Sequence, residues 1–335
     1  MSLKKNSILI TGGTGSFGKA FVKKLINSKA KISRLIIFSR DELKQFEMSQ
    51  LYPKKKFPFI RFFLGDVRDE KRLISATENI ETIIHAAALK QVPTTEYNPF
   101  EAIKTNILGA NNLIEASIKN NIKNVIALST DKACSPINLY GATKLCSDKL
   151  FISANNIKGN KNIKFSVVRY GNVLGSRGSV IPFFLNYPHK NILPITDKRM
   201  TRFNITLDQA VDVVMWSIKN LKGGELLVPK LPSYRIIDVA KAINPNCKFN
   251  FIGIRPGEKI HEEMISSSDS QNTIELEKYY LILPSLDKNI LSKYKKLFKC
   301  KKVKDNFVYD SNNNKKFLSQ KEIKTMINQF KSTYK

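Results

Sequence analysis

Short apolar runs and amphipathic segments alternate along the first half of the chain. The apolar runs are rich in β-branched and aromatic side chains, with little alternation between apolar and polar positions. Such runs are typical of strands that are buried on both faces, as in a parallel sheet. The strands expected on this basis are Ser7–Thr11, Arg34–Ser39, Ile60–Gly65, Thr82–Ala86, Val125–Ser129 and Phe165–Arg169.

Helical periodicity fills the intervals between these strands. The segments with apolar residues at helical spacing are Gly18–Ser28, Arg40–Leu51, Glu70–Glu78, Pro99–Asn120 and Tyr140–Asn155. Regular alternation of strand and helix predicts an α/β fold with a doubly wound parallel sheet of the Rossmann type.

The pattern changes after Arg169, where loops and short elements dominate. The glycine-rich stretch Gly171–Gly178 is followed by expected helices over Leu207–Leu221 and Arg235–Ile243 and by a strand over Phe249–Ile252. This change indicates a smaller lobe of mixed α/β structure, distinct from the regular first half.

We therefore expect three regions. Residues 1–170 form the Rossmann domain, with its sheet completed by later segments; residues 171–275 mainly form the substrate-binding lobe; and residues 276–335 form a C-terminal extension. The extension contains a lysine-rich amphipathic segment and ends in a helix near Ser319–Phe330. Ser319 and Glu322 have the spacing of a capping box at the start of that helix.

Charge and composition limit the partners. The 335-residue chain carries a formal net charge of +28, but its lysines are spread over the whole length. No basic segment is interleaved with base-stacking aromatic residues, so we expect an anionic small-molecule substrate and no nucleic acid. Isolated cysteines and few histidines give no metal-ligand spacing, and no metal site is expected.

The apolar runs also bear on location. None approaches the roughly 20 residues that span a bilayer, so no membrane association is expected. The basic start, Met1–Asn6, leads directly into the first strand and a glycine loop, a pattern unlike that of a signal peptide. We therefore expect a cytoplasmic protein.

A glycine motif follows the first strand and opens the first helix. Gly12 allows the tight turn, Gly15 lets a pyrophosphate approach the backbone, and Gly18 lets the helix pack closely on the strand. The amides at the helix N-terminus then hold the phosphates. The residues expected to bind a dinucleotide here are Gly12, Thr14, Gly15, Ser16, Phe17 and Gly18.

The end of the second strand distinguishes NADP from NAD. Arg40 and Lys44 can neutralise a 2′-phosphate, with Ser39 as a donor, which favours NADP. Asp41 could instead accept hydrogen bonds from the ribose hydroxyls, which keeps NAD open as an alternative. Further cofactor contacts are expected from Glu42, Asp66, Val67, Ala86, Ala87, Lys90, Leu128, Ser129, Val173 and Arg177.

Candidate reactive groups lie around the fifth strand. Tyr140 and Lys144 are four residues apart on a helix and share one face, so the ammonium can lower the pKa of the phenol. The tyrosinate can then take a hydroxyl proton as hydride leaves the same carbon. Thr130 is placed to bind the reacting oxygen, and Asp131 and Lys132 are acid and base candidates; a surface turn with two solvated charges is the alternative.

Longer segments carry a family resemblance over about residues 7–275. They are SRDELKQ (Ser39–Gln45), HAAALKQVP (His85–Pro93), EYNP (Glu96–Pro99), LSTDKA (Leu128–Ala133), NLYGATK (Asn138–Lys144), RYGNVLGSRGSVIPFF (Arg169–Phe184), ITDKRMTRF (Ile195–Phe203) and IRPGEKIHE (Ile254–Glu262). Together they closely resemble the inverting UDP-N-acetylglucosamine 4,6-dehydratases of pseudaminic acid biosynthesis. This family belongs to the extended short-chain dehydrogenases/reductases.

The resemblance implies a complete reaction. Tyr140 with Lys144 would oxidise C4 and pass hydride to a tightly bound NADP. Lys132 would remove the C5 proton, Asp131 would protonate the departing C6 hydroxyl, and hydride would return to C6. Reprotonation at C5 on the opposite face would give UDP-2-acetamido-2,6-dideoxy-β-L-arabino-hex-4-ulose. Retaining relatives typically have Asp-Glu after the threonine, so Lys132 favours inversion.

The resemblance also implies partners. The residues expected to bind UDP-N-acetylglucosamine are Lys90, Thr130, Tyr140, Asn172, Arg199, Arg202, Arg255 and Glu258. The family implies a homo-oligomer, a dimer or a hexamer, and a role in flagellin glycosylation. Two alternatives stay open: a related UDP-sugar dehydratase or epimerase, and a non-catalytic NADP-binding module, against which the intact Tyr140, Lys144, Asp131 and Lys132 argue.

Overall fold

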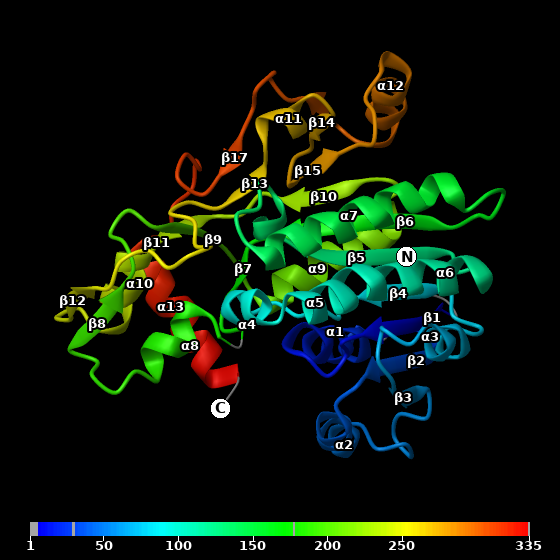
Figure 1. Ribbon diagram of the computed structural model, residues 1–335, viewed down its shortest axis with the longest axis horizontal. Coiled ribbons are helices and arrows are strands. Elements are labelled where there is room, and N and C mark those ends of the chain that lie inside the picture. Colours follow the sequence, from blue (N-terminus) through cyan, green and yellow to red (C-terminus); the bar gives the residue numbers. More distant parts are fainter. Residues whose placement is uncertain (1–5, 29–30, 177, 334–335) are drawn as a thin grey trace.

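A ten-stranded sheet runs through the molecule, in the order β16-β14-β15-β10-β6-β5-β4-β1-β2-β3 (Figure 1). The computed structural model describes residues 6–28, 31–176 and 178–333. The strands from β10 to β3 are parallel to one another, whereas β15, β14 and β16 add an antiparallel edge. The predicted Rossmann sheet is therefore confirmed, and its antiparallel edge is an addition that the sequence pattern did not indicate.

The parallel strands coincide closely with the apolar runs. They are β1 (Asn6–Thr11), β2 (Ile32–Ser39), β3 (Ile60–Leu64), β4 (Thr82–His85), β5 (Asn124–Thr130), β6 (Lys164–Tyr170) and β10 (Leu226–Pro229). The chain order reverses between β1 and β4, so the loops that follow these two strands diverge. This is the place where open α/β sheets bind ligands.

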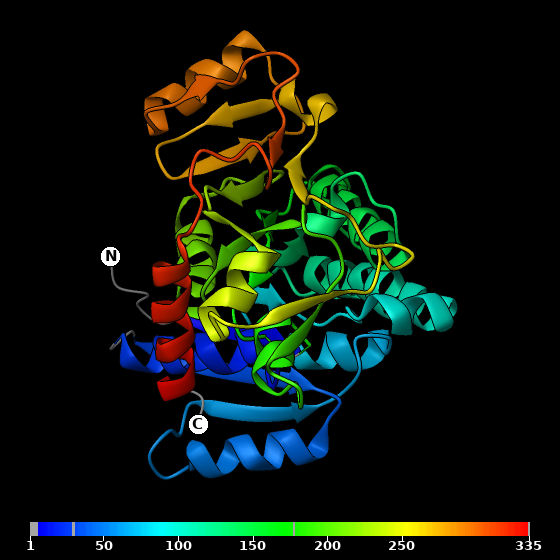
Figure 2. The same cartoon turned by 90° about the vertical axis from the view of Figure 1, so that its left-hand side faces the viewer.

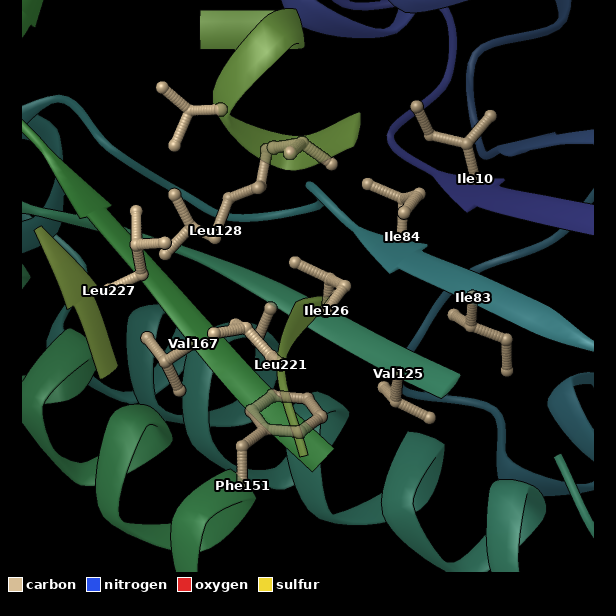
Figure 3. Close-up of a cluster of buried hydrophobic side chains, with 14 of the residues drawn as sticks. Ile10, Ile83, Ile84, Val125, Ile126, Leu128, Phe151, Val167, Leu221 and Leu227 are labelled. Atoms are coloured by element: carbon tan, nitrogen blue, oxygen red, sulfur yellow. The ribbon is translucent and has the colours of Figure 1, made fainter. Parts of the chain in front are cut away.

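Both faces of the sheet are covered. Helices α1 (Ser16–Asn27) and α9 (Leu207–Asn220) pack together on one face; α3 (Glu70–Ala76), α6 (Gly109–Lys119) and α7 (Leu139–Ile157) lie side by side on the other. Successive strand residues point to opposite faces, as Figure 3 shows for Ile83 and Ile84 and for Val125 and Ile126. All four are buried, which explains the continuous apolar runs.

The segment expected as one helix over Pro99–Asn120 contains a π-helical turn. It divides into α5 (Pro99–Ile103), the π turn η1 (Lys104–Leu108) and α6. Asn106 in this turn is buried and exchanges hydrogen bonds with the backbone of Leu89 at 2.8 and 2.9 Å, and it donates to Thr143 of α7 at 3.0 Å. The turn therefore fixes the loop after β4 against α7. The short helix α4 (Val92–Tyr97) follows that loop and was not predicted.

The lobe lies to the left of the sheet in Figure 1. A three-stranded sheet joins β7 (Asn172–Val173), β9 (Thr201–Ile205) and β11 (Ser233–Arg235), and β8 (Ile192–Ile195) pairs with β12 (Lys248–Phe251). The lobe's helices include α8 (Val180–Leu185) and α10 (Ile236–Ile243).

Residues 276–335 are divided between the two parts of the molecule. Strand β15 (Tyr279–Ile282) extends the main sheet between β10 and β14 (Thr273–Glu275). Helix α12 (Lys288–Leu297) follows it in the chain, and β16 (Lys301–Lys302) pairs with β14. The C-terminal helix α13 (Gln320–Thr333) packs instead on α10 of the lobe (Figure 2). Ile323 and Ile327 of α13 are buried there with Val239 of α10. Among the described residues, no helix is long and apolar enough to cross a membrane.

Candidate active site

One cleft, of about 1790 Å³, lies at the carboxyl ends of the parallel strands and is lined from both the sheet and the lobe. Of the predicted site residues that the structure describes, all but Glu42 and Arg199 line it. Glu42 lies in the first turn of α2 (Glu42–Leu51), and Arg199 is exposed and paired with Asp197 at 2.7 Å. Arg177 lies outside the described residues.

The glycine motif forms a cradle at the start of α1. Gly12 has a φ of +64°, and a Cβ there would lie 2.9 Å from the backbone nitrogen of Ala87 after β4. A Cβ at Gly18 would lie 2.2 Å from the carbonyl oxygen of Gly13, so only glycine lets α1 pack this closely. The N-cap of α1 makes no side-chain hydrogen bond, and its first turn contains no acidic residue. These amides fit a dinucleotide pyrophosphate.

Asp41 and Arg40, which follow β2, differ in the contacts that their side chains make. Asp41 caps α2 by accepting from the amide of Lys44 at 3.0 Å, and its carboxylate is paired with the Lys44 ammonium. Arg40 borders the cleft with a side chain that is 55% exposed, and its guanidinium is 3.8 Å from Asp66. A cation therefore borders the cleft, while Asp41, the next residue in the chain, is engaged with its own helix.

The turn after β5 brings the predicted reactive groups together. Asp131 and Lys132 belong to a 3₁₀ turn, η2 (Asp131–Ala133), and the side chain of Thr130 hydrogen-bonds to Tyr140 at the start of α7. Close contact depends on Gly141, because a Cβ there would lie 2.1 Å from the carbonyl oxygen of Lys132. The YGATK glycine thus lets the tyrosine helix approach the acid/base turn.

A second buried carboxylate completes this turn. The Lys132 ammonium lies 3.0 Å from Asp131 and 3.1 Å from Glu262. Glu262 directly precedes strand β13 (Glu263–Ile265). Both acids are almost fully buried. Glu262 was given no role from the sequence, because only the fold brings it to Lys132; no local spacing signals it.

The charges of this cluster follow from burial and pairing. Burial would lower the pKa of Lys132, but Asp131 and Glu262 raise it above its ordinary value. Burial and the charge of Glu262 raise the pKa of Asp131, against the influence of Lys132. For Glu262, burial is outweighed by Lys132 and Arg202, which lower its pKa. The cluster therefore favours an ionised Glu262 and a proton shared by Asp131 and Lys132.

The pKa values of Tyr140 and Lys144 on α7 are also shifted. Burial raises the pKa of Tyr140 to about 12, although Lys132 and Thr130 act in the opposite direction. Burial lowers the pKa of Lys144, which Asp148 partly offsets. The Tyr140–Lys144 spacing predicted a lowered phenol pKa, but burial outweighs the neighbouring groups and raises it.

A buried network supports this helix from behind. Asp148, one turn after Lys144, accepts from the hydroxyl of Ser129 at 2.7 Å and from the guanidinium of Arg169 at 3.2 Å. Arg169 also donates to the carbonyl of Met264 at 3.1 Å. The network connects β5, β6 and α7 next to Lys144, and no local sequence spacing indicates it.

The predicted substrate residues fall into two groups. Lys90 and Asn172 lie close to the reactive turn: burial and then Lys132 lower the pKa of Lys90, and Asn172 hydrogen-bonds to Tyr234. Arg255 and Glu258 pair with each other at 3.0 Å on the loop before β13. Arg202 is buried and donates to the carbonyls of Lys259 and Ile260 at 2.8 and 2.9 Å, so it holds that loop in place.

This fold and this cleft define a nucleotide-binding enzyme of the short-chain dehydrogenase/reductase class. A family model described as polysaccharide biosynthesis protein matches residues 8–284, and the chain belongs to that family.

Two curated relatives illustrate its range. The inverting UDP-N-acetylglucosamine 4,6-dehydratase of Campylobacter jejuni subsp. jejuni serotype O:2 is 54% identical over 330 residues, 97% of this chain and 98% of that protein. The predicted resemblance is thereby confirmed. A UDP-glucose 4-epimerase of Rickettsia bellii is 43% identical over 283 residues, 82% of each chain.

Solved structures agree with the fold. Pen from Bacillus thuringiensis superimposes with a TM-score of 0.87, at 37% identity and with 99% of each chain covered. DesIV, a dTDP-glucose 4,6-dehydratase from Streptomyces venezuelae with NAD and TYD bound, gives a TM-score of 0.69 at 16% identity, covering 97% of each chain. At that lower identity the likeness concerns the fold alone.

Proposed function

We propose that the chain is an inverting UDP-N-acetylglucosamine 4,6-dehydratase, a lyase that forms UDP-2-acetamido-2,6-dideoxy-β-L-arabino-hex-4-ulose. One observation carries the proposal. The Lys132 ammonium lies between buried Asp131 and Glu262, in the same cleft as Tyr140 and Lys144. Alcohol oxidation needs the tyrosine and lysine alone, whereas elimination of water needs an additional acid and base. The identity to the Campylobacter dehydratase supports the same assignment.

The residues divide the chemistry between them. Tyr140, held by Thr130, takes the proton of the C4 hydroxyl, and Lys144 holds the sugar side of the cofactor. Lys132 removes the C5 proton, which the adjacent ketone acidifies, and Asp131 protonates the C6 hydroxyl as it leaves. The raised pKa of Asp131 suits a carboxylic acid that donates a proton. A proton from solvent returns to C5 on the opposite face.

The proposed cofactor is NADP, tightly bound and recycled within each turnover. The cradle at α1 suits the pyrophosphate, and Ser39, Arg40 and Lys44 line the cleft where a 2′-phosphate would lie. Asp41 is engaged with its own helix, which weakens the case for NAD. When bound, the nicotinamide would accept hydride from C4 and return it at C6.

The proposed substrate contacts follow the geometry of the cleft. Lys90 and Asn172, beside the reactive turn, are assigned to the sugar, and Arg255 and Glu258 to the nucleotide diphosphate. Arg202 acts through the loop whose carbonyls it binds. We further propose that the protein is a cytoplasmic homo-oligomer, as the family resemblance implies. Its product would serve pseudaminic acid synthesis and flagellin glycosylation.

A second candidate is 4-epimerisation of a UDP-hexose, because a relative at 43% identity bears the name UDP-glucose 4-epimerase. Both reactions begin by oxidising C4, but an epimerase returns hydride to C4 and has no need of the Asp131–Lys132 pair.

Deuterium at C4 of UDP-N-acetylglucosamine distinguishes the two reactions. We expect mass spectrometry and NMR to find the label at C6 of a 4-keto-6-deoxy sugar after incubation with the purified holoenzyme. Label retained at C4 of an epimerised sugar would instead establish the second candidate. A UDP-glucose substrate provides the parallel control.

A further inference from the structure

Lys132 cannot act as a base in the protonation state that its surroundings favour. An amine that sits 3.0 Å from one carboxylate and 3.1 Å from another is held as an ammonium. It must lose a proton before it can accept one from C5. Asp131, in turn, must gain a proton before it can protonate the leaving hydroxyl. One transfer, from Lys132 Nζ to Asp131 Oδ1, supplies both needs.

We propose that Glu262 is the positioning residue for this transfer: its carboxylate holds Lys132 against Asp131, and its negative charge keeps the shared proton on the Asp131–Lys132 pair. The inference rests on the proposed dehydratase function and assigns a role to a residue outside the Tyr140, Lys144, Asp131 and Lys132 set.

The placement of Glu262 is fixed from several sides. Its amide donates to the hydroxyl of Ser311 at 2.9 Å, and its carbonyl accepts from the amide of the same residue at 2.8 Å. Its loop is pinned to the reactive turn, because Lys259 donates to the carbonyl of Cys134 at 2.7 Å and Asn138 donates to the carbonyl of Gly257 at 2.8 Å. These hydrogen bonds hold the loop in place, with the Glu262 carboxylate next to Lys132.

Both acids of the cluster keep one oxygen unused. Within the described chain, Asp131 Oδ2 and Glu262 Oε2 are buried and accept no hydrogen bond. Ionising both Asp131 and Glu262 in such surroundings costs free energy, because each of the two oxygens lacks the hydrogen bonds that water would supply. Placing one proton on Asp131 relieves this cost, and Asp131 lines the cleft together with Lys132.

Other charges around the cluster favour ionisation of Glu262 over Asp131. Arg202 Nε lies 3.7 Å from Glu262 Oε1, and Lys259 is on the same loop. The titratable and charged groups that act on the cluster are Asp131 and Lys132 of η2, Lys90 after β4, Tyr140 of α7, Arg202 of β9, Tyr234 of β11, and Lys259 and Glu262 before β13.

The proton count closes over the elimination. The Lys132 N–H bond breaks and an Asp131 O–H bond forms; the freed nitrogen lone pair then takes the C5 proton. Asp131 gives its proton to the C6 hydroxyl as the C6–O bond breaks, and water leaves. Lys132 is again an ammonium and Asp131 again a carboxylate. Glu262 keeps its charge throughout and never exchanges a proton with the substrate.

The test compares Glu262→Gln, Glu262→Asp and the neighbouring control Glu263→Gln in the holoenzyme. For each we would measure the pH profile of kcat, and the C4 oxidation step by single-turnover absorbance of the reduced nicotinamide. Glu262→Gln is expected to slow elimination roughly 10- to 100-fold while oxidation persists. Glu263→Gln is expected to behave like the wild type.

The pH profile separates an electrostatic role from a merely structural one. The Glu262 charge raises the pKa of Asp131 and of Lys132, so its removal lowers the pKa of the proton that the pair shares. The alkaline limb of kcat should therefore move to lower pH in Glu262→Gln and return in Glu262→Asp, which keeps the charge.

Three results would overturn the proposal. They are an unchanged kcat and alkaline limb in Glu262→Gln, a kcat that falls equally at every pH, and a Glu262→Asp variant whose limb stays displaced. If Glu262→Gln does not fold, Glu262→Asp decides through its limb and its elimination rate, which must lie near wild type. A wild-type enzyme that oxidises C4 without eliminating water would instead refute the proposed function, and the inference with it.

Discussion

At the scale of single residues, Lys132 is the side chain that we propose to distinguish dehydration from alcohol oxidation. It is the cation between Asp131 and Glu262, and its side chain is 25% exposed toward the cleft. In the proposed reaction, Tyr140 and Lys144 serve the oxidation step, whereas Lys132 serves the elimination. Changes at Lys132 should therefore separate the two half-reactions.

Lys132→Met keeps the length of the side chain and removes its charge. Dehydration is expected to fall by at least about 10²-fold, since a positioned base is lost, while NADP binding and C4 oxidation persist. Product formation by NMR and cofactor content by absorbance check this. Lys123→Met, at an exposed lysine paired with Glu81, is the matched control. A fully active Lys132→Met enzyme would show that another group removes the C5 proton.

Arg40 is the residue that should set cofactor preference. Arg40→Ala is expected to weaken NADP binding about tenfold or more and to change NAD binding little, because the guanidinium would contact the 2′-phosphate alone. Titration calorimetry on cofactor-free protein gives both affinities. Arg34→Ala, at the other end of β2, controls for the loss of a positive charge. Equal weakening of both cofactors would contradict the assignment of NADP.

At the scale of elements, the site depends on how closely α7 approaches the turn after β5. Asn138 caps α7 by accepting from the amide of Gly141 at 2.8 Å, and Glu96 of α4 accepts from the amide of Leu139 at 2.7 Å. The helix start is therefore held by two side chains while Gly141 lies against the backbone of Lys132. The acid/base turn and the tyrosine are positioned as one unit.

Gly141→Ala tests this close approach. The added methyl would lie 2.1 Å from a carbonyl oxygen, so α7 or the turn must shift. Forcing a group into packed surroundings costs about 1–3 kcal/mol, and the displaced turn should lose most of its dehydratase activity. Urea denaturation and activity assays measure the two effects. Cys146→Ala, an exposed position on the same helix, should change neither; a Gly141→Ala enzyme with normal stability and activity would refute the account.

At the scale of the whole molecule, the first half of the chain, in which strands and helices alternate regularly, was predictable from the sequence. Parallel strands that are buried on both faces are visible in the sequence as continuous apolar runs. Glycines at positions where another backbone segment approaches closely are visible as a motif. The antiparallel strands β14, β15 and β16 are two to four residues long, too short for a periodic pattern. The packing of α13 on the lobe and the approach of Glu262 to Lys132 are long-range contacts, which no local spacing encodes.

Dehydration with inversion at C5 is tested most directly by turnover of UDP-N-acetylglucosamine in deuterated water, followed by NMR. We expect a 4-keto-6-deoxy sugar of L-arabino configuration that carries solvent deuterium at C5, formed without added NADP if the cofactor co-purifies. A product of D-xylo configuration would contradict inversion, and a product that keeps its C6 hydroxyl would contradict dehydration itself.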